Sequence, residues 1–213
     1  MSAFNPVERF TRSARITIAL YRIYQAMNYL LRERGKARQL SPAQIQALLF
    51  LKYARPGVRT VGGLADRLGV SYATASGVVD ALERKQLLTR SPLPTDQRIV
   101  MLALTTQGER ETILLEDVLD EIERTVAALP DHDQEVLIRA TQSIIRHLQE
   151  RGYVKVYEMC WGCQFFRRDA HPDDPRGPHH CAYVDAPLPE QHTYLECPDF
   201  TPAEQGKMST ERG

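Results

Sequence analysis

The sequence has no long apolar segment and no visible targeting signal. Its longest apolar run is far shorter than the roughly 20 residues that a membrane-spanning helix needs. No charged, apolar and small-residue leader precedes the first amphipathic stretch, and no internal repeat is visible. With 43% hydrophobic residues, the chain can still build a packed core. We therefore expect a folded, cytoplasmic protein that does not enter a membrane.

Catalytic signatures are missing as well. The sequence contains no nucleophile elbow, no phosphate-binding loop and no dinucleotide-binding fingerprint. Cysteine is absent until residue 160, and the four cysteines then follow within the last quarter of the chain. Four thiolates on one metal would leave no open coordination position for hydrolysis. We therefore predict that the protein is not an enzyme.

The formal net charge of zero conceals an uneven distribution. Residues 1–104 carry 16 Lys and Arg against 6 Asp and Glu, a net charge of +10. Residues 105–213 carry 11 against 21, a net charge of −10. A basic amino-terminal half is typical of a protein that binds a polyanion, and the acidic half is then kept away from that partner. A chance mixture of solvated charges is the alternative interpretation.

Long amphipathic stretches flank a central region. Apolar residues recur at helical spacing over residues 7–34, and again in two segments that begin at Thr105 and at Asp131. We expect residues 1–40 and 105–152 to form a helical dimerisation region that buries a second copy of the chain. The alternative is that these segments are ordinary core helices.

The central residues 41–104 have the pattern of a winged helix-turn-helix. Ser41 is expected to cap one helix, and a short helix over residues 61–68 ends at Gly69, which favours a left-handed turn. Ser71 caps the next helix, the predicted recognition helix. Its inward stripe has the spacing i, i+3, i+4 and i+7 and consists of Ala75, Val78, Val79 and Leu82.

A predicted hairpin wing follows, and it carries a family resemblance. Two strands, residues 87–90 and 99–104, enclose a polar loop that contains Asp96 and Arg98. The Asp-x-Arg at the loop, the apolar strand and the Leu-Thr-x-x-Gly that ends at Gly108 together resemble the MarR family of winged-helix regulators, over residues 7–151. The resemblance implies a mainly α fold with a winged helix-turn-helix and long dimerisation helices. It also implies an obligate homodimer on pseudo-palindromic double-stranded DNA.

A winged helix of this kind places its recognition helix in the major groove and its wing in the adjacent minor groove. We expect Arg98 to enter the minor groove, held by Asp96 through a salt bridge, although a solvent-exposed ion pair is the alternative. The outward face of the recognition helix is small and mostly neutral, so phosphate contacts should supply much of the affinity. On and beside that face we expect DNA contacts from Tyr72, Ala73, Thr74, Ser76, Gly77 and Arg84. The phosphate contacts are expected from Arg59, Arg67, Arg84, Lys85 and Arg90.

Residues 153–203 form an extension beyond the part that resembles the family, and residues 204–213 are expected to be a disordered tail. The residues after 152 hold seven of the thirteen prolines and few aliphatic side chains, so we expect a small irregular segment that a metal holds in order. In a reducing compartment, clustered cysteines favour metal over disulfides. One full set of thiolate ligands is supplied by Cys160, Cys163, Cys181 and Cys197.

The spacing of these cysteines favours an iron–sulfur cluster over zinc. One Cys-x-x-Cys pair, with single cysteines after seventeen and then fifteen residues, resembles the ligand pattern of high-potential iron–sulfur proteins, which implies a 4Fe-4S cluster. Zinc ribbons generally pair two Cys-x-x-Cys knuckles, and only one is present. Aromatic side chains that could shield a cluster are Trp161, Phe165, Phe166, Tyr183 and Phe200. Structural zinc and metal-free thiols remain the alternatives.

These patterns predict a homodimeric DNA-binding regulator whose extension senses redox or iron state. A second hypothesis keeps the regulator and makes the extension a zinc-held structural element. A third is an iron–sulfur electron-transfer or redox accessory protein that uses its helices only to dimerise and does not bind DNA. The sequence also leaves open the alternative that a separate small-molecule pocket lies between the dimerisation and DNA-binding regions.

Overall fold

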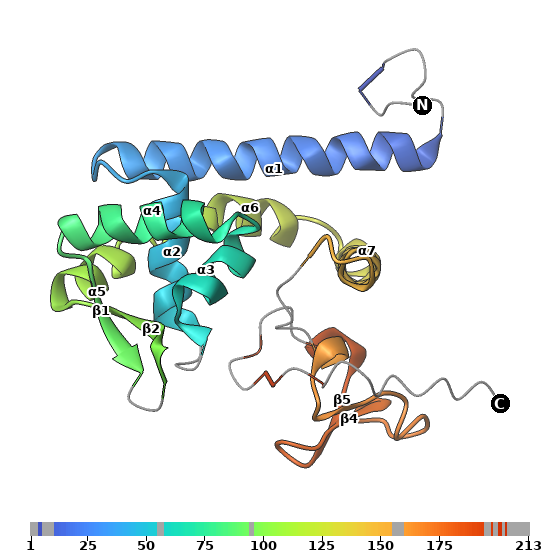
Figure 1. The fold of residues 1–213 in the computed structure, drawn as a ribbon. Coiled ribbons are helices and arrows are strands. Elements are labelled where there is room, and N and C mark those ends of the chain that lie inside the picture. The colour runs from blue at the N-terminus through green and yellow to red at the C-terminus, as the bar shows by residue number, and fades with distance from the viewer. Residues whose placement is uncertain are drawn as a thin grey trace. The chain divides into compact units, whose positions relative to one another are not determined.

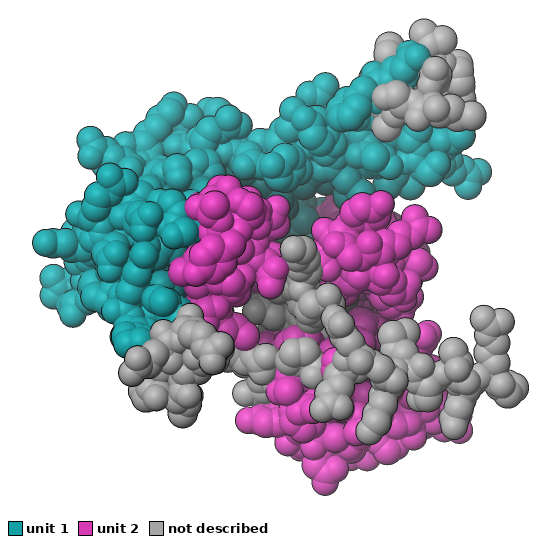
Figure 2. Space-filling view, viewed as in Figure 1, with its two compact units in different colours: residues 1–52, 76–128 teal, residues 53–75, 129–213 magenta. Residues whose placement is uncertain are grey.

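A computed structural model describes residues 4–5, 11–54, 58–93, 96–154, 160–193, 197, 200–201 and 203. The chain divides into two compact units, which Figure 2 distinguishes by colour. Unit 1 comprises residues 1–52 and 76–128, and unit 2 comprises residues 53–75 and 129–213. Within the described ranges, no helix is both long and apolar enough to cross a membrane. The predicted tail, residues 204–213, lies outside the described residues.

The first helix, α1 (Arg12–Lys36), is the longest element of the described chain (Figure 1). Thr11 caps it by accepting a hydrogen bond from the backbone N–H of Ala14. The helix ends at Lys36, two residues after the amphipathic stretch that the sequence shows. Gly35 is needed in its last turn, because a Cβ at this position would overlap the carbonyl oxygen of Leu40.

Three further helices follow in the predicted order: α2 (Pro42–Tyr53), α3 (Val61–Leu68) and α4 (Tyr72–Arg84) (Figure 1). Each predicted cap is confirmed. Ser41 and Gln44 form a reciprocal capping box on α2, and the Ser71 hydroxyl accepts from the Thr74 N–H. Gly69 ends α3 in the left-handed conformation with φ of 63°.

The wing is an antiparallel hairpin of β1 (Leu88–Leu93) and β2 (Asp96–Leu104). Both strands extend further toward the loop than the sequence predicted, with a register shift near Leu93. Leu88 and Leu102 are buried and anchor the base of the hairpin in the core of unit 1. Other large side chains that are fully buried in the described part of this unit are Ile45, Leu48, Leu51, Val79, Leu82, Thr112 and Leu115.

The helix predicted to begin at Thr105 is interrupted, which corrects the sequence-based expectation of one continuous helix. The structure has α5 (Thr106–Ile113), a 3₁₀ turn η2 (Glu116–Leu119) and α6 (Asp120–Ala127). The interruption buries Leu115 and Val118 and brings Asp117 to Arg34 of α1, with which it forms an ion pair. Contacts distant in sequence therefore decide the break.

The last long helix, α7 (Asp131–Glu150), follows Pro130 as predicted, and the chain turns at Gly152 with φ of 74°. The extension is more regular than expected. It contains η3 (Cys160–Gly162), η4 (Glu190–His192) and a three-stranded antiparallel sheet in the order β3-β4-β5. The strands are β3 (Phe166–Arg167), β4 (His179–Cys181) and β5 (Ala186–Leu188).

Candidate nucleic-acid interface and cysteine cluster

The recognition helix α4 separates a buried stripe from an exposed face. Ala75, Val79 and Leu82 are fully buried, as predicted, and Val78 is half-buried. On the other side the side chain of Tyr72 is 61% exposed. Exposed or half-buried with it are Ala73, Thr74, Ser76, Gly77 and Arg84. This face is therefore accessible to a partner, and its small side chains would let the helix backbone approach that partner closely.

Several of the predicted phosphate ligands already have protein partners. The Arg90 guanidinium on β1 forms ion pairs with Asp80 and, at 3.4 Å, with Glu83, both on α4. Lys85 donates to the carbonyl oxygen of Gln39 and, at 3.3 Å, to the side chain of Gln44. To contact a phosphate, either cation would have to leave these partners or bind the phosphate and the protein partner at the same time.

The remaining three basic candidates lie at the ends of helices. Arg84 is exposed in the last turn of α4, where its Nε donates weakly, at 3.4 Å, to the carbonyl of Asp80. Arg59 precedes α3, and its Nε donates to the carbonyl oxygen of Ala54 at 2.6 Å. Arg67 is half-buried in the last turn of α3. Of these three arginines, Arg84 is therefore the most accessible to a phosphate.

The wing-tip pair lies at the edge of the described structure. The backbone of Asp96 and Arg98 belongs to β2, but their side chains lie outside the described part. Residue spacing did not predict the ion pairs of Arg90 with Asp80 and Glu83 (the Arg90 bracket), which join the wing to the recognition helix. Its acidic partners lie seven and ten residues away in sequence, and only the hairpin fold brings them to Arg90.

A junction of close backbone contacts joins the wing to α5. The Thr105 hydroxyl donates to the carbonyl oxygen of Gln86 at 2.6 Å and accepts from the N–H of Gly108 at 3.0 Å. A Cβ on Gly108 would overlap the carbonyl oxygen of Leu87. The Leu-Thr-x-x-Gly pattern therefore has a physical basis: threonine caps the helix, and glycine lets the helix approach the strand.

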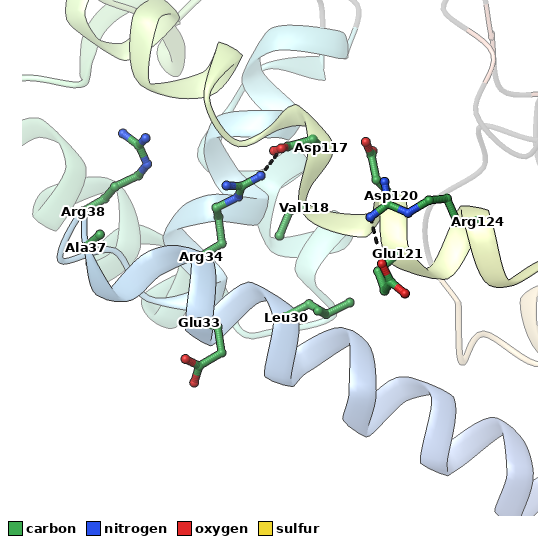
Figure 3. A pocket seen from close by; sticks show the side chains of 10 residues that line it. All are labelled: Leu30, Glu33, Arg34, Ala37, Arg38, Asp117, Val118, Asp120, Glu121 and Arg124. Atoms are coloured by element: carbon green, nitrogen blue, oxygen red, sulfur yellow. Dashed lines mark hydrogen bonds and ion pairs between the residues drawn. The ribbon is translucent and has the colours of Figure 1, made fainter.

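An open groove of about 480 Å³ lies in unit 1 between α1 and the η2–α6 segment (Figure 3). Leu30 and Val118 provide its apolar lining. Its arginines have acidic partners: Arg34 pairs with Asp117, Arg38 with Glu111 at 2.8 Å, and Arg124 with Glu121 at 2.8 Å. A small anion would have to displace a carboxylate to bind here.

In the extension, backbone hydrogen bonds bring the cysteine-bearing segments together. The N–H of Cys163 donates to the carbonyl of Cys160 at 2.9 Å, so these two residues share one tight turn. Cys181 on β4 pairs in register with Phe166 on β3, three residues after Cys163. The arm that carries Cys197 also joins this group, because the Thr201 carbonyl accepts from the N–H of Gln164 at 2.8 Å and the Gly162 carbonyl accepts from that of Ala203 at 2.9 Å.

The side chains themselves have not converged on one point. All four cysteines are thiols, of which Cys160 is buried and the others are half-buried. In the described part of the chain, no group of three or more His, Cys, Asp or Glu side chains is close enough to hold a metal ion. The predicted ligand set therefore shares one small sheet and its neighbouring turns, without forming a coordination sphere.

The aromatic and histidine side chains of the extension pack around the Cys160–Cys163 turn. The Trp161 ring lies 4.9 Å from that of Phe166 and 5.4 Å from that of His179, measured between centroids. His179 is buried; its Nδ1 accepts from the Asp169 N–H, so its Nε2 carries the proton that bonds to Glu190 at 2.5 Å. These residues make a small core in which aromatic rings take the place of aliphatic side chains.

Comparison with known proteins identifies the family. A family model described as the MarR family matches residues 38–99. The HTH-type transcriptional regulator YhbI of Bacillus subtilis is 30% identical over 104 residues, which are 46% of this chain and 68% of that protein. The chain belongs to the MarR family. Another relative, the transcriptional regulator MhqR of the same organism, is 28% identical over 129 residues, which are 59% of this chain and 86% of MhqR.

Solved structures share the MarR fold. A structure of Staphylococcus aureus MepR in complex with DNA has a TM-score of 0.57 at 24% identity and covers 65% of this chain and 99% of its own. CouR of Rhodococcus jostii RHA1, solved with bound p-coumaroyl-CoA, has a TM-score of 0.54 at 23% identity. The match covers 63% of this chain and 94% of the CouR chain. The MepR match thus leaves about a third of this chain without a counterpart.

Proposed function

We propose that this MarR family regulator binds double-stranded DNA as a homodimer, with α4 in the major groove and the wing against the adjacent minor groove. The observation that carries this proposal is that α4 has two different faces. Its apolar stripe is buried, and the face around Tyr72 and Gly77 is exposed. The Arg90 bracket to Asp80 and Glu83 supports it further, since it holds the wing and the recognition helix in one orientation. Phosphate contacts then supply affinity, and Arg98 supplies a minor-groove contact.

The homodimer is supported by apolar residues that a single chain leaves exposed. On α7, Leu137, Ile144 and Leu148 are 37–39% exposed and recur at intervals of seven and four residues, the spacing of a helix-packing stripe. On α1, exposed apolar side chains are Ile16, Tyr21, Ile23, Tyr24 and Tyr29. A second copy of the chain would bury both sets, and a two-fold dimer matches a pseudo-palindromic operator.

The DNA-binding proposal is tested at the wing tip. A duplex selected from a random pool by the wild-type protein serves as the probe. Arg98→Ala should weaken binding to it by about 1–3 kcal/mol, with thermal unfolding unchanged. Arg139→Ala is the matched control, because it removes an exposed arginine from α7 and should leave affinity within about 0.5 kcal/mol. Equal affinities of the wild-type protein and the Arg98→Ala variant in a gel-shift titration would exclude the minor-groove role.

We further propose that Cys160, Cys163, Cys181 and Cys197 bind one metal centre, an iron–sulfur cluster in preference to zinc. Support comes from the main-chain hydrogen bonds that join the three cysteine-bearing segments and from the thiol chemistry of the donor set. The aromatic packing around Trp161 favours a cluster, because solvent exclusion tunes its potential. Side-chain rotation must complete the ligand sphere. When bound, a cluster would supply a one-electron redox response, and zinc a structural cross-link.

Metal analysis after anaerobic purification tests this centre. Iron and acid-labile sulfide in a brown protein support the cluster, and stoichiometric zinc in a colourless protein supports the structural alternative. Substitution of all four cysteines by serine should abolish the bound metal in either case. A wild-type protein with neither metal would refute the centre altogether. Equal DNA affinity of wild-type and four-serine proteins under oxidising and reducing conditions would refute sensing.

A further inference from the structure

One end of the cysteine set is fastened to α7 through a buried amide. The Gln142 side chain on α7 is 5% exposed, and its Nε2 donates to both the carbonyl oxygen and the hydroxyl of Thr193, at 3.2 and 3.1 Å. Thr193 is fully buried, and its hydroxyl donates to the Glu190 carbonyl at 2.8 Å. Thr193 lies four residues before Cys197, so this contact fixes the start of the arm that carries the last cysteine.

The other end is fastened to α7 through an arginine. The Arg146 guanidinium lies over the Trp161 ring, 4.8 Å from its centroid, and Trp161 stands between Cys160 and Cys163. A cation over an indole face is an attractive contact that is strongest where water is excluded. The two ends of the cysteine set therefore meet the same helix within one turn.

These contacts occupy one side of α7, and the stripe of Leu137, Ile144 and Leu148 occupies the other, although the exposed Ile138 lies on the side of Gln142. Gln142 and Arg146 are four residues apart and so lie on one face. Ile144 stands two residues from each of them, about 160–200° around the helix at 3.6 residues per turn. Leu137 and Leu148 lie within about 40° of Ile144 by the same geometry. The extension and the proposed dimer interface therefore hold opposite faces of α7.

We infer that α7 relays the state of the cysteine centre to the dimer through Gln142 and Arg146. The inference rests on the metal centre and the homodimer proposed above. With one metal bound, the Cys160 turn and the Cys197 arm are cross-linked, and both contacts hold α7 at once. Without the metal, the two segments are joined by main-chain hydrogen bonds such as those of Gln164 and Ala203 and not by a metal–thiolate cross-link, so α7 is held less firmly on the face opposite its partner.

Hydrogen exchange read by mass spectrometry tests the relay in the full-length protein. The metal found by analysis is removed from wild-type protein with a chelator, under anaerobic conditions. We expect exchange of the amides in residues 137–148 to rise about tenfold or more, as loss of a buried hydrogen-bond pair and a cation–π contact implies. In the Gln142→Leu/Arg146→Ala variant, the same treatment should change exchange less than about twofold. Leucine fills the glutamine volume and removes Oε1, which has no hydrogen-bond partner among the described residues.

Arg139→Ala is the matched control on the same helix, because Arg139 is exposed and pairs only weakly, at 3.9 Å, with Glu135. It should keep the wild-type response. If metal-loaded and metal-free wild-type proteins exchange equally along α7, the relay is refuted while the metal centre stands. If the variant responds as wild-type does, the two contacts are not the route. Wild-type protein that holds no metal refutes the centre, and the relay with it.

Discussion

At the scale of single residues, close approaches between backbone segments explain Gly35, Gly108 and Thr105. Because Gly35 and Gly108 have no Cβ, the carbonyl groups of Leu40 and Leu87 can pack directly against their helices. Thr105 hydrogen-bonds to Gln86 on one side of the contact between the wing and α5 and to Gly108 on the other. The sequence pattern identified Thr105 and Gly108 as a motif, but the reason for glycine appears only when the strand lies beside the helix.

Gly108→Ala should destabilise the protein by about 1–3 kcal/mol, because the new Cβ must push the wing strand away from α5. Urea unfolding of both variants and wild-type measures the effect. Gly77→Ala is the matched control for stability, since a Cβ there meets no atom within 4 Å. It should stabilise α4 by up to about 1 kcal/mol. Equal stabilities of the two variants would contradict the close-contact explanation.

A carboxylate in the extension gives a prediction about pH. The side-chain hydrogen bonds from Arg176, followed by its backbone N–H, lower the pKa of Asp174 from 3.8 to about 2. Because the folded-state pKa is depressed, the contribution of this turn to stability is complete above pH 3.8 and is lost only as pH falls toward 2. A carbon-13 NMR titration should find Asp174 ionised at pH 3. A midpoint at its ordinary value, or a depressed pKa of Asp174 that persists in the Arg176→Ala variant, would contradict this cause.

At the scale of elements, the local pattern determined most of the helices and the wing. Caps, glycine turns and the i, i+3, i+4, i+7 stripe act within a few residues, so α2, α3, α4 and α7 follow from neighbouring residues alone. The break between α5 and α6 does not, because burial of Leu115 and the ion pair between Arg34 and Asp117 decide it. The short sheet of the extension was not predicted either, because its strands are only two or three residues long. Strands of that length show no alternating pattern in the sequence.

The bracket between the wing and the recognition helix is an interaction between elements, and a double-mutant cycle tests it. Asp80→Ala and Arg90→Ala should each destabilise the protein, and the double variant should cost less than their sum by about 0.5–1 kcal/mol. Thermal or urea unfolding supplies the four stabilities. Strict additivity would mean that the ion pair contributes nothing. Arg139→Ala combined with Asp80→Ala gives a control pair, which we expect to be additive.

At the scale of the whole molecule, the exposed apolar side chains are as informative as the buried ones. Apolar side chains of α1 and the stripe of Leu137, Ile144 and Leu148 on α7 remain exposed in one chain, although the helical spacing of the sequence predicted a buried face on both helices. The acidic half of the chain includes α7 and the extension, and the basic half includes the winged helix. This division suits the proposed contact of the winged helix with DNA, because phosphates attract basic segments and repel acidic ones.

Ile144→Glu should disrupt the dimer. Two-fold symmetry places the change in the interface twice, so burial of two unpaired carboxylates should raise the dimer dissociation constant by about a hundredfold or more. Sedimentation velocity over a range of protein concentrations measures this constant. Val184→Glu is the control, because Val184 is exposed on the extension and outside both stripes. An unchanged dimer in the Ile144→Glu variant would place the interface elsewhere.

The sequence by itself determined the helix-turn-helix, the wing and the family, since each is specified by residues close together in the chain. Only the tertiary structure decided that Arg90 joins the wing to the recognition helix and that α5 ends early. It also decided that Gln142 and Arg146 fasten the extension to α7. Those features depend on side chains that are brought together from distant positions by burial of apolar surface. Local spacing carries no information about such pairs.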